Sequence, residues 1–92
     1  MHVISYKRIK EAELIWPSIK NALEGWYHII SKNTYLDFAS LKATFGSVDK
    51  VGKHYVFDIG GNKYRLISII HFNRQKIYIR EILTHKNYDK GK

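Results

Sequence analysis

The stretch His54–Leu83, with the sequence HYVFDIGGNKYRLISIIHFNRQKIYIREIL, decides the fold that we expect for this chain. It is rich in Val, Ile, Tyr and Phe, residues that favour extended structure. Gly60-Gly61 is typical of a two-residue hairpin turn, and Asn73-Arg74 gives a weaker signal for a second one. The stretch therefore predicts three consecutive strands, over 54–59, 62–72 and 75–83.

The segment before this stretch predicts helices. Val and Ile favour a short strand over 2–5, and apolar residues at spacings of three and four favour an antiparallel pair of helices over 6–15 and 17–31. Residues 32–48 are mixed and predict one short helical turn. We therefore expect a single α+β domain over residues 1–92, in which two N-terminal helices pack on one face of an antiparallel sheet.

The alternation of side chains along the strands predicts one apolar sheet face. Two-residue turns place Tyr55 opposite Leu66 and Ile70 opposite Ile77, and a period of two assigns the other side chains to a face. The helices should cover this face. Its members are Tyr55, Phe57, Ile59, Tyr64, Leu66, Ser68, Ile70, Phe72, Ile77, Ile79 and Leu83.

The opposite face gathers basic side chains around an apolar floor. In the expected register Arg65 lies opposite Ile82, which makes Arg65 and Arg80 diagonal neighbours on adjacent strands. The face comprises His54, Val56, Asp58, Lys63, Arg65, Ile67, Ile69, His71, Lys76, Tyr78, Arg80 and Ile82.

The charge of the chain is strongly basic and unevenly distributed. Sixteen Lys and Arg residues against eight Asp and Glu residues give a net charge of +8. Residues 63–92 carry eight basic and two acidic groups, a net of +6. Such a concentration of charge attracts polyanions through counterion release, so we expect a nucleic-acid partner or an acidic protein partner.

Other features of the composition narrow the class of protein. The sequence has no cysteine, which excludes a disulfide scaffold and a thiolate zinc site. The N-terminal residues show no signal-peptide pattern, and no apolar run approaches membrane-spanning length. We expect a cytoplasmic protein with no membrane association. The carboxylates and histidines show no metal-ligand spacing, so we expect no metal and no other cofactor.

The basic face suits the chemistry of RNA cleavage. A pair of guanidiniums, from Arg65 and Arg80, can clamp a phosphate and stabilise the charge that develops on its oxygens. His85 lies just past the last strand and is suited to proton transfer near neutral pH. RNA supplies its own nucleophile, the 2′-hydroxyl, so a metal-free reaction needs only an acid, a base and phosphate stabilisers.

Each of these side chains also has a structural interpretation. Arg65 and Arg80 can form surface ion pairs, for which alternation leaves only Asp58 on the same face. Tyr78 can stack on a base or simply fill the sheet face. His85 and Tyr88 can merely tie down the C-terminal tail.

Three stretches, taken together, resemble the HigB branch of the RelE/ParE toxin superfamily. They are Met1–Ser5 (MHVIS), Gly60–Leu66 (GGNKYRL) and Ile79–Asp89 (IREILTHKNYD), and the resemblance covers nearly the whole chain. It implies a RelE-like β-α-α-β-β-β fold and an mRNA interferase that cleaves mRNA on the ribosome without a metal. It also implies a cognate HigA-like antitoxin as partner.

The resemblance also implies roles for individual residues. Arg65 and Arg80 match arginines that contact the scissile phosphate, His85 matches an acid or base, and Tyr88 and Asp89 match terminal positions that some members use. The catalytic set that we expect is therefore Arg65, Arg80, His85 and Tyr88. The residues expected to bind RNA are Lys53, His54, Lys63, Lys76, Tyr78 and Lys86.

Three functions remain open on the sequence. The first is an endoribonuclease in which the 2′-hydroxyl attacks the phosphate and leaves a 2′,3′-cyclic phosphate. The second is a ParE-like, non-enzymatic inhibitor of a protein target such as gyrase, against which His85 and Tyr88 argue. The third is a module that binds RNA without cutting it.

Overall fold

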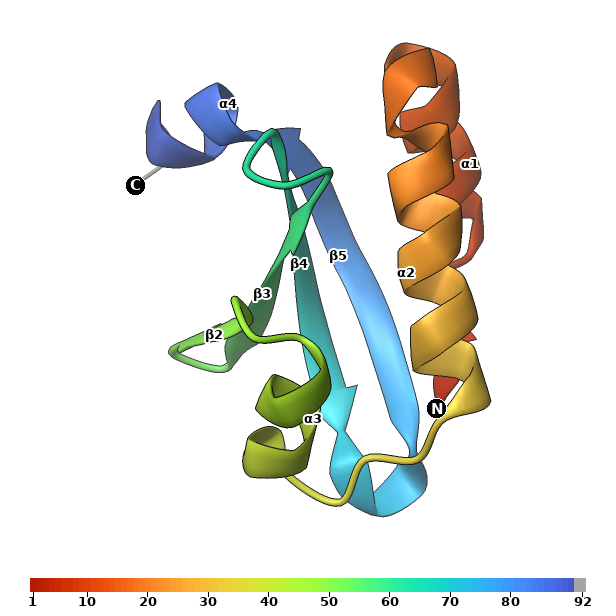
Figure 1. The fold of residues 1–92 in the computed structure, drawn as a ribbon, viewed down its shortest axis with the longest axis vertical. Coiled ribbons are helices and arrows are strands. Elements are labelled where there is room, and N and C mark those ends of the chain that lie inside the picture. Colours follow the sequence, from red (N-terminus) through yellow and green to blue (C-terminus); the bar gives the residue numbers. More distant parts are fainter. Residues whose placement is uncertain (91–92) are drawn as a thin grey trace.

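The computed structural model describes the backbone of residues 1–90 and the side chains of residues 1–88. Over residues 1–90 the chain forms a five-stranded sheet with the strand order β1-β5-β4-β3-β2, together with helices (Figure 1). The elements are β1 (His2–Ile4), α1 (Lys7–Ile15), η1 (Pro17–Ile19), α2 (Lys20–Lys32), α3 (Phe38–Thr44), β2 (Asp49–Val51), β3 (His54–Ile59), β4 (Tyr64–His71), η2 (Phe72–Arg74), β5 (Lys76–Thr84) and α4 (His85–Lys90).

The α+β class is confirmed, but the expectation of an antiparallel sheet is wrong at one edge. Strand β1 pairs with β5 in parallel, with Val3 opposite Ile77, so the sheet is mixed. A parallel neighbour requires a long crossover connection, and the crossover here runs through α1, α2 and most of the chain. Side-chain alternation within a three-residue strand carries no information on its direction. The structure also adds β2 and α4, which the sequence pattern did not predict.

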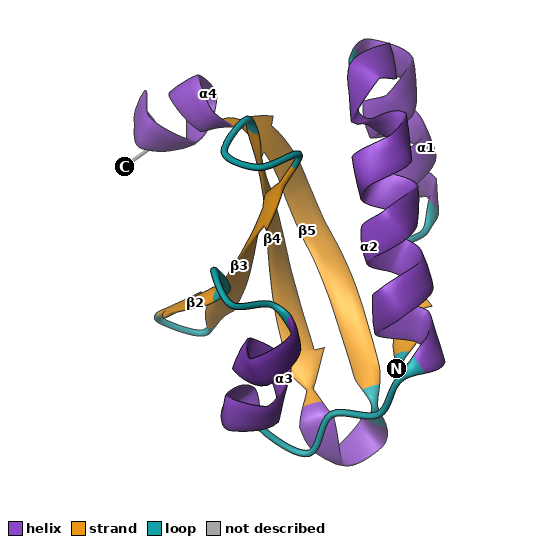
Figure 2. Cartoon of the chain, viewed as in Figure 1, coloured by secondary structure: helices purple, strands orange, loops and turns teal. Residues whose placement is uncertain are grey.

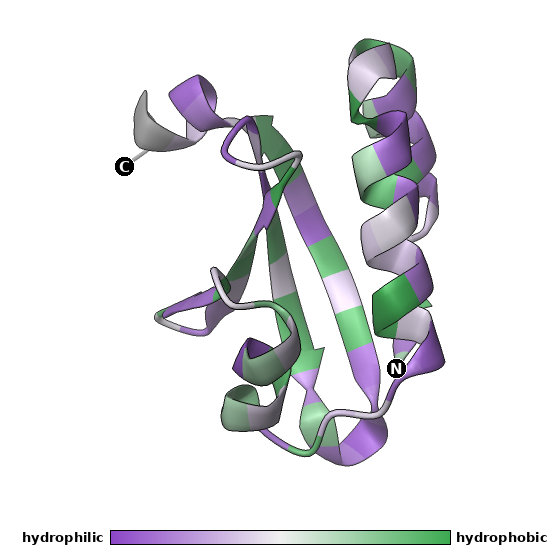
Figure 3. Cartoon of the chain, viewed as in Figure 1, coloured by the Kyte–Doolittle hydropathy of each residue, from purple (hydrophilic) through white to green (hydrophobic). Residues whose placement is uncertain are grey.

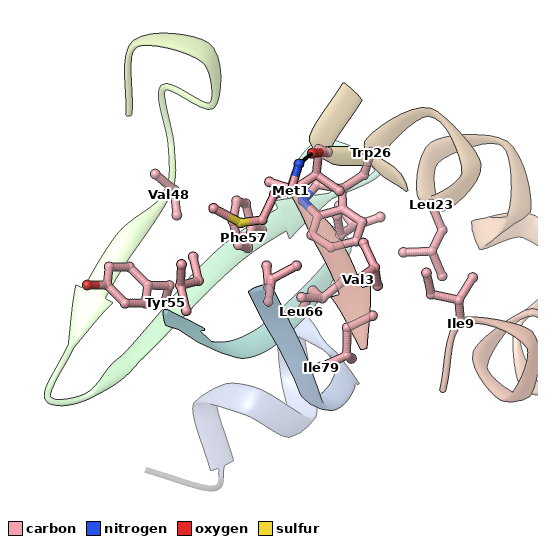
Figure 4. Packing of buried hydrophobic residues seen from close by; sticks show 14 of the residues in the cluster. Met1, Val3, Ile9, Leu23, Trp26, Val48, Tyr55, Phe57, Leu66 and Ile79 are labelled. Atoms are coloured by element: carbon pink, nitrogen blue, oxygen red, sulfur yellow. Dashed lines mark hydrogen bonds between the residues drawn. The ribbon is translucent and has the colours of Figure 1, made fainter. Parts of the chain in front are cut away.

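Helices α1 and α2 lie side by side along one side of the sheet (Figure 2). They run antiparallel, because the start of α1 meets the second half of α2: the ring centroids of Tyr6 and Tyr27 are 4.8 Å apart. Trp26 of α2 meets Phe57 of β3 edge-on, at 5.3 Å between ring centroids. Figure 4 shows Ile9, Leu23 and Trp26 directed at the strand residues of the core.

The apolar face expected from alternation is confirmed for most of its members. Phe72 is half-buried, and Leu83 lies on the other face. The buried members are Tyr55, Phe57, Ile59, Tyr64, Leu66, Ser68, Ile70, Ile77 and Ile79. Ser68 is fully buried, and its hydroxyl donates a hydrogen bond to the carbonyl oxygen of Tyr55 at 2.9 Å, which satisfies the polar group.

The first hairpin has a longer loop than the two residues expected. Ile59 pairs with Tyr64, so residues 60–63 form the loop, and Tyr55 lies opposite Ser68 instead of Leu66. Gly60 and Gly61 have φ of 66° and 70°, a left-handed conformation that glycine adopts without steric cost. The register is shifted by two residues, an even number, so the side chains of β3 and β4 keep their predicted faces.

A β-bulge in β5 changes the end of the sheet nearest α4. Ser68 pairs with Ile79 but Ile67 pairs with Glu81, which leaves Arg80 as the extra residue. The predicted pairing of Ile70 with Ile77 is confirmed, whereas Arg65 lies opposite Leu83 and not Ile82. Ile82 packs against the core. Arg80 and Glu81 are consecutive polar residues of β5, and the hydropathy colours along β5 show this break in alternation (Figure 3).

Within residues 1–90, no helix is both long and apolar enough to cross a membrane.

Candidate active site

The guanidinium of Arg65 is the centre of the candidate site. Arg65 lies near the start of β4, directly opposite Asp58 of β3. Its Nε forms an ion pair with Oδ1 of Asp58 at 3.2 Å, and its side chain is only 12% exposed. Its Nη2 donates to Oδ1 of Asn62 at 2.9 Å, and its Nη1 makes long contacts of 3.4 Å with the carbonyl oxygens of Asn62 and Tyr64.

Helix α4 brings His85 and Tyr88 onto this guanidinium. The backbone N–H of His85 donates to the carbonyl oxygen of Lys63 at 2.8 Å, which ties the start of α4 to the hairpin loop (Figure 1). Nδ1 of His85 lies 2.8 Å from Nη2 of Arg65. Tyr88, three residues further along α4 and so on the same helix face, places its ring 5.9 Å from Cζ of Arg65.

The contact between Arg65 and His85 determines the tautomer of the imidazole. A guanidinium only donates hydrogen bonds and never accepts them. Nδ1 of His85 must therefore accept the hydrogen bond from Nη2, and the ring proton is on Nε2. The site thus holds an imidazole whose basic nitrogen is engaged by a cation.

An apolar hollow of about 150 Å³ adjoins the cluster. Tyr88 belongs to both, because its ring contacts Arg65 and also forms one wall of the hollow. The other lining residues are Val51, His54, Val56 and Ile67. Val56 is buried although it lies on the sheet face away from the helices. The hollow is therefore the apolar floor that alternation predicted for this face.

The structure brings together only part of the predicted catalytic set. Arg65, His85 and Tyr88 are in mutual contact through Arg65. Arg80 is exposed on the bulge of β5. The register that made Arg65 and Arg80 diagonal neighbours is wrong: Arg65 lies opposite Leu83, because alternation cannot reveal the extra residue of a bulge. Asp89 lies outside the side chains that the structure describes.

The residues expected to bind RNA fall into two groups. Lys53, His54, Lys63 and Lys86 belong to the turns, strand end and helix around the cluster and its hollow. Lys76 and Tyr78 lie at the other end of β5, where the ring of Tyr78 contacts that of His71 at 5.4 Å between centroids. The side chains expected to bind RNA therefore form two separate groups on the predicted basic face.

Arg65 has two further polar side-chain partners, Asp58 and Asn62. The ion pair with Asp58, which alternation allowed as a structural alternative, is present. Asn62 lies in the hairpin loop, where its amide oxygen accepts a hydrogen bond from Nη2 of Arg65. The sequence signal that could have indicated this contact is the position of Asn62 in the hairpin, three residues before Arg65. Among the side chains of residues 1–88, no three histidines or carboxylates gather as a potential metal site.

The fold and the site together define a small, basic α+β protein whose guanidinium, imidazole and phenol converge beside an apolar hollow. Comparison with known proteins identifies the family to which this protein belongs. Residues 19–91 match the HigB toxin family, described as the RelE-like toxic component of a toxin-antitoxin system.

Full-length relatives agree with the family match. The chain is 42% identical over 92 residues to the mRNA interferase toxin HigB of Escherichia coli (strain K12), covering 97% of this chain and 88% of the relative. The same values hold for the mRNA interferase HigB of Shigella flexneri. A second Escherichia coli mRNA interferase HigB, from strain CFT073, is 30% identical, covering 98% of this chain and 90% of the relative. The chain therefore belongs to the HigB toxin family, and the resemblance stated from the sequence is confirmed.

Proposed function

We propose that this chain is a metal-independent mRNA interferase, the toxin of a type II toxin-antitoxin system. It cleaves mRNA on the ribosome in the cytoplasm and so inhibits translation. A cognate HigA-like antitoxin neutralises it. The relatives' names support the activity, and the observation that carries the proposal is the contact between Arg65 and His85 on the basic sheet face.

The fold that we propose is the RelE-like arrangement, in which a β-α-α-β-β-β chain presents one sheet face to RNA. The helix pair occupies the apolar face, which leaves the opposite face with Arg65 and the hollow for the substrate. Helix α4 completes the site by returning the C-terminal end to that face. This arrangement supports the family's function because it separates the core from the reactive surface.

The reaction that we propose is an internal transesterification. The 2′-oxygen of RNA bonds to phosphorus while the bond to the 5′-oxygen breaks, which gives a 2′,3′-cyclic phosphate and a 5′-hydroxyl. The phosphate competes with His85 for Nη2 of Arg65. When a phosphate oxygen takes the Nη2 hydrogen that faced His85, Nδ1 of His85 is free to take the proton of the 2′-hydroxyl. The hydroxyl of Tyr88 supplies the proton to the leaving 5′-oxygen.

The remaining predicted residues have supporting roles in this proposal. Arg80, exposed on the bulge, contributes charge to the phosphate path. The hollow beside Tyr88 receives the base of a nucleotide next to the scissile bond, because an aromatic wall and an apolar floor favour stacking. The lysines and Tyr78 hold the flanking RNA.

The test is the mapping of new RNA 5′ ends after expression of the wild type and variants. His85→Ala and Arg65→Ala should lower the cleavage rate by roughly 10²- to 10⁴-fold, the range for removal of an acid–base group. His28→Ala, on the exposed face of α2, is the matched control and should cleave as the wild type does.

Two results would overturn the proposal. Blocked translation without any new 5′ ends would identify a module that binds RNA but does not cut it. Altered DNA supercoiling with intact mRNA would identify a gyrase-directed inhibitor. Full cleavage by a folded His85→Ala variant would leave the activity standing but remove His85 from it.

A further inference from the structure

The side chain of Arg65 is held more firmly than that of an arginine that binds phosphate on an open surface. All three of its guanidinium nitrogens have protein partners, and the side chain is 12% exposed. A largely buried cation needs a compensating charge, because burial without one is costly. Among residues 1–88, the carboxylate that supplies this charge is Asp58.

Each guanidinium nitrogen of Arg65 contacts a different set of partner atoms. Asp58 holds Nε from the neighbouring strand, and Asn62 holds one hydrogen of Nη2 from the hairpin loop. The other hydrogen of Nη2 is directed at Nδ1 of His85. The contacts at Nη1, both 3.4 Å, are long, so an incoming oxygen can replace them as well.

Asp58 therefore acts on His85 through Arg65. Since Nε and Nη2 belong to one rigid plane, fixing Nε also fixes the direction of the Nη2–H bond to His85. Without the charge of Asp58, the guanidinium can rotate toward solvent, and Nδ1 loses the hydrogen bond from Nη2. Asp58 and Asn62 make no contact with Nδ1 themselves in the described part of the chain.

We propose that Asp58, with Asn62, is a positioning residue that sets the orientation of Arg65 and, through it, the tautomer of His85. This inference rests on the proposed RNA cleavage for its kinetic consequence, but its structural consequence is independent of any activity. Asp58 is then distinct from a surface ion-pair residue, whose removal would change stability alone.

The experiment compares Asp58→Asn with Glu11→Gln, both of which remove one negative charge. Glu11 is exposed on α1, outside the cluster. Nitrogen NMR of the imidazole rings reports which ring nitrogen carries the proton, and His85→Gln identifies the signal among the five histidines. We expect wild-type His85 to carry its proton on Nε2. Asp58→Asn should shift this signal, whereas Glu11→Gln should leave it unchanged.

Single-turnover cleavage of a defined RNA is the second readout. Asp58→Asn should slow the cleavage step by roughly 10- to 100-fold, as expected when a reacting group is misplaced. It should bind RNA as tightly as Glu11→Gln does, because both changes make the chain equally more basic. Asn62→Ala, in the exposed hairpin loop, should act in the same direction and does not depend on removal of a half-buried charge.

The outcomes separate this inference from the proposed function. A proton on Nδ1 of wild-type His85 overturns the positioning role. Unchanged His85 signals in both Asp58→Asn and Asn62→Ala also overturn it, as does cleavage by Asp58→Asn at the rate of Glu11→Gln. If the wild type cleaves no RNA, the proposed function fails, while the NMR comparison still decides whether Asp58 positions Arg65 and His85.

Discussion

At the scale of single residues, Arg65 combines the two roles that were expected to be alternatives. It forms the ion pair with Asp58 that a structural interpretation required, and it also contacts His85 and Tyr88 as a functional interpretation required. The two roles are compatible because the planar guanidinium presents separate nitrogens to separate partners. A lysine at this position has a single nitrogen, so it could not both pair with Asp58 and contact His85 as Arg65 does.

Val56 provides a second test at this scale, directed at the hollow. Val56→Phe should fill part of the 150 Å³ space with its ring and exclude a nucleobase. The affinity for a short single-stranded RNA should fall roughly tenfold or more, since stacking of a base on an aromatic side chain contributes about 1–3 kcal/mol. Fluorescence anisotropy with labelled RNA measures the change.

The control for this variant is Leu14→Phe, which adds an aromatic ring at a position of α1 that is 83% exposed. Its affinity for RNA should equal that of the wild type. Thermal melting of both variants checks the fold. A folded Val56→Phe chain that binds RNA normally would show that no base enters the hollow.

At the scale of elements, the turn between β4 and β5 is joined to the loop after α2 by one side chain. The amide of Gln75 donates to the carbonyl oxygens of Tyr35 at 2.6 Å and Phe72 at 2.8 Å, and its oxygen accepts from the N–H of Tyr35 at 3.2 Å. These bonds hold residue 75 in a left-handed conformation with φ of 53°. Gln75 thereby fastens the turn that sets the register of β5.

Gln75→Ala should destabilise the fold by about 2–3 kcal/mol, because three hydrogen bonds contribute roughly 1 kcal/mol each. Gln75→Gly loses the same bonds but adopts the left-handed backbone without a Cβ penalty of about 1–2 kcal/mol. Glycine should therefore be less destabilising than alanine at this position. Urea denaturation measures both, and a free energy of unfolding for Gln75→Ala within 0.5 kcal/mol of the wild type, roughly the scatter of neutral surface changes, would contradict the role.

At the scale of the whole molecule, the chain has a net charge of +8, and its lysines lie both on the helix pair and around the candidate site. The helix pair covers the apolar face, while Lys63 of the hairpin loop and Lys86 of α4 belong to the elements that form the candidate site. If RNA lies along that side, the salt dependence of binding should depend on which lysines are present, because each neutralised phosphate releases counterions.

We therefore expect a difference between two double variants of equal charge. Replacing Lys63 and Lys86 by Ala should reduce the slope of log K against log salt by about 1.4, or roughly 0.7 for each lost contact to a single strand. Replacing Lys20 and Lys32, both exposed on α2, should leave the slope unchanged. Equal slopes for the two variants would show that the RNA does not follow the proposed side.

Local patterns in the sequence predicted the features that depend on neighbours along the chain. Alternation identified the buried face of β3 and β4, and the assignment survived a wrong hairpin length because the register error was even. The same pattern failed after Ile79, where the bulge inserts Arg80 and exchanges the faces of Ile82 and Leu83. A bulge is stabilised by the fit of the whole sheet, which no local pattern contains.

The sequence by itself determined the fold class, the helix pair, the basic face and the residue types of the candidate site. These follow from the periodicity of apolar residues, from glycine's access to positive φ and from charge. Only the tertiary structure decided that β1 runs parallel to β5, that Arg80 lies on a bulge and that Asp58 and Asn62 hold Arg65. It also decided that His85 lies against Arg65, twenty residues away in the chain. The physical reason is that such contacts depend on how distant segments pack, whereas sequence patterns report only the preferences of adjacent residues.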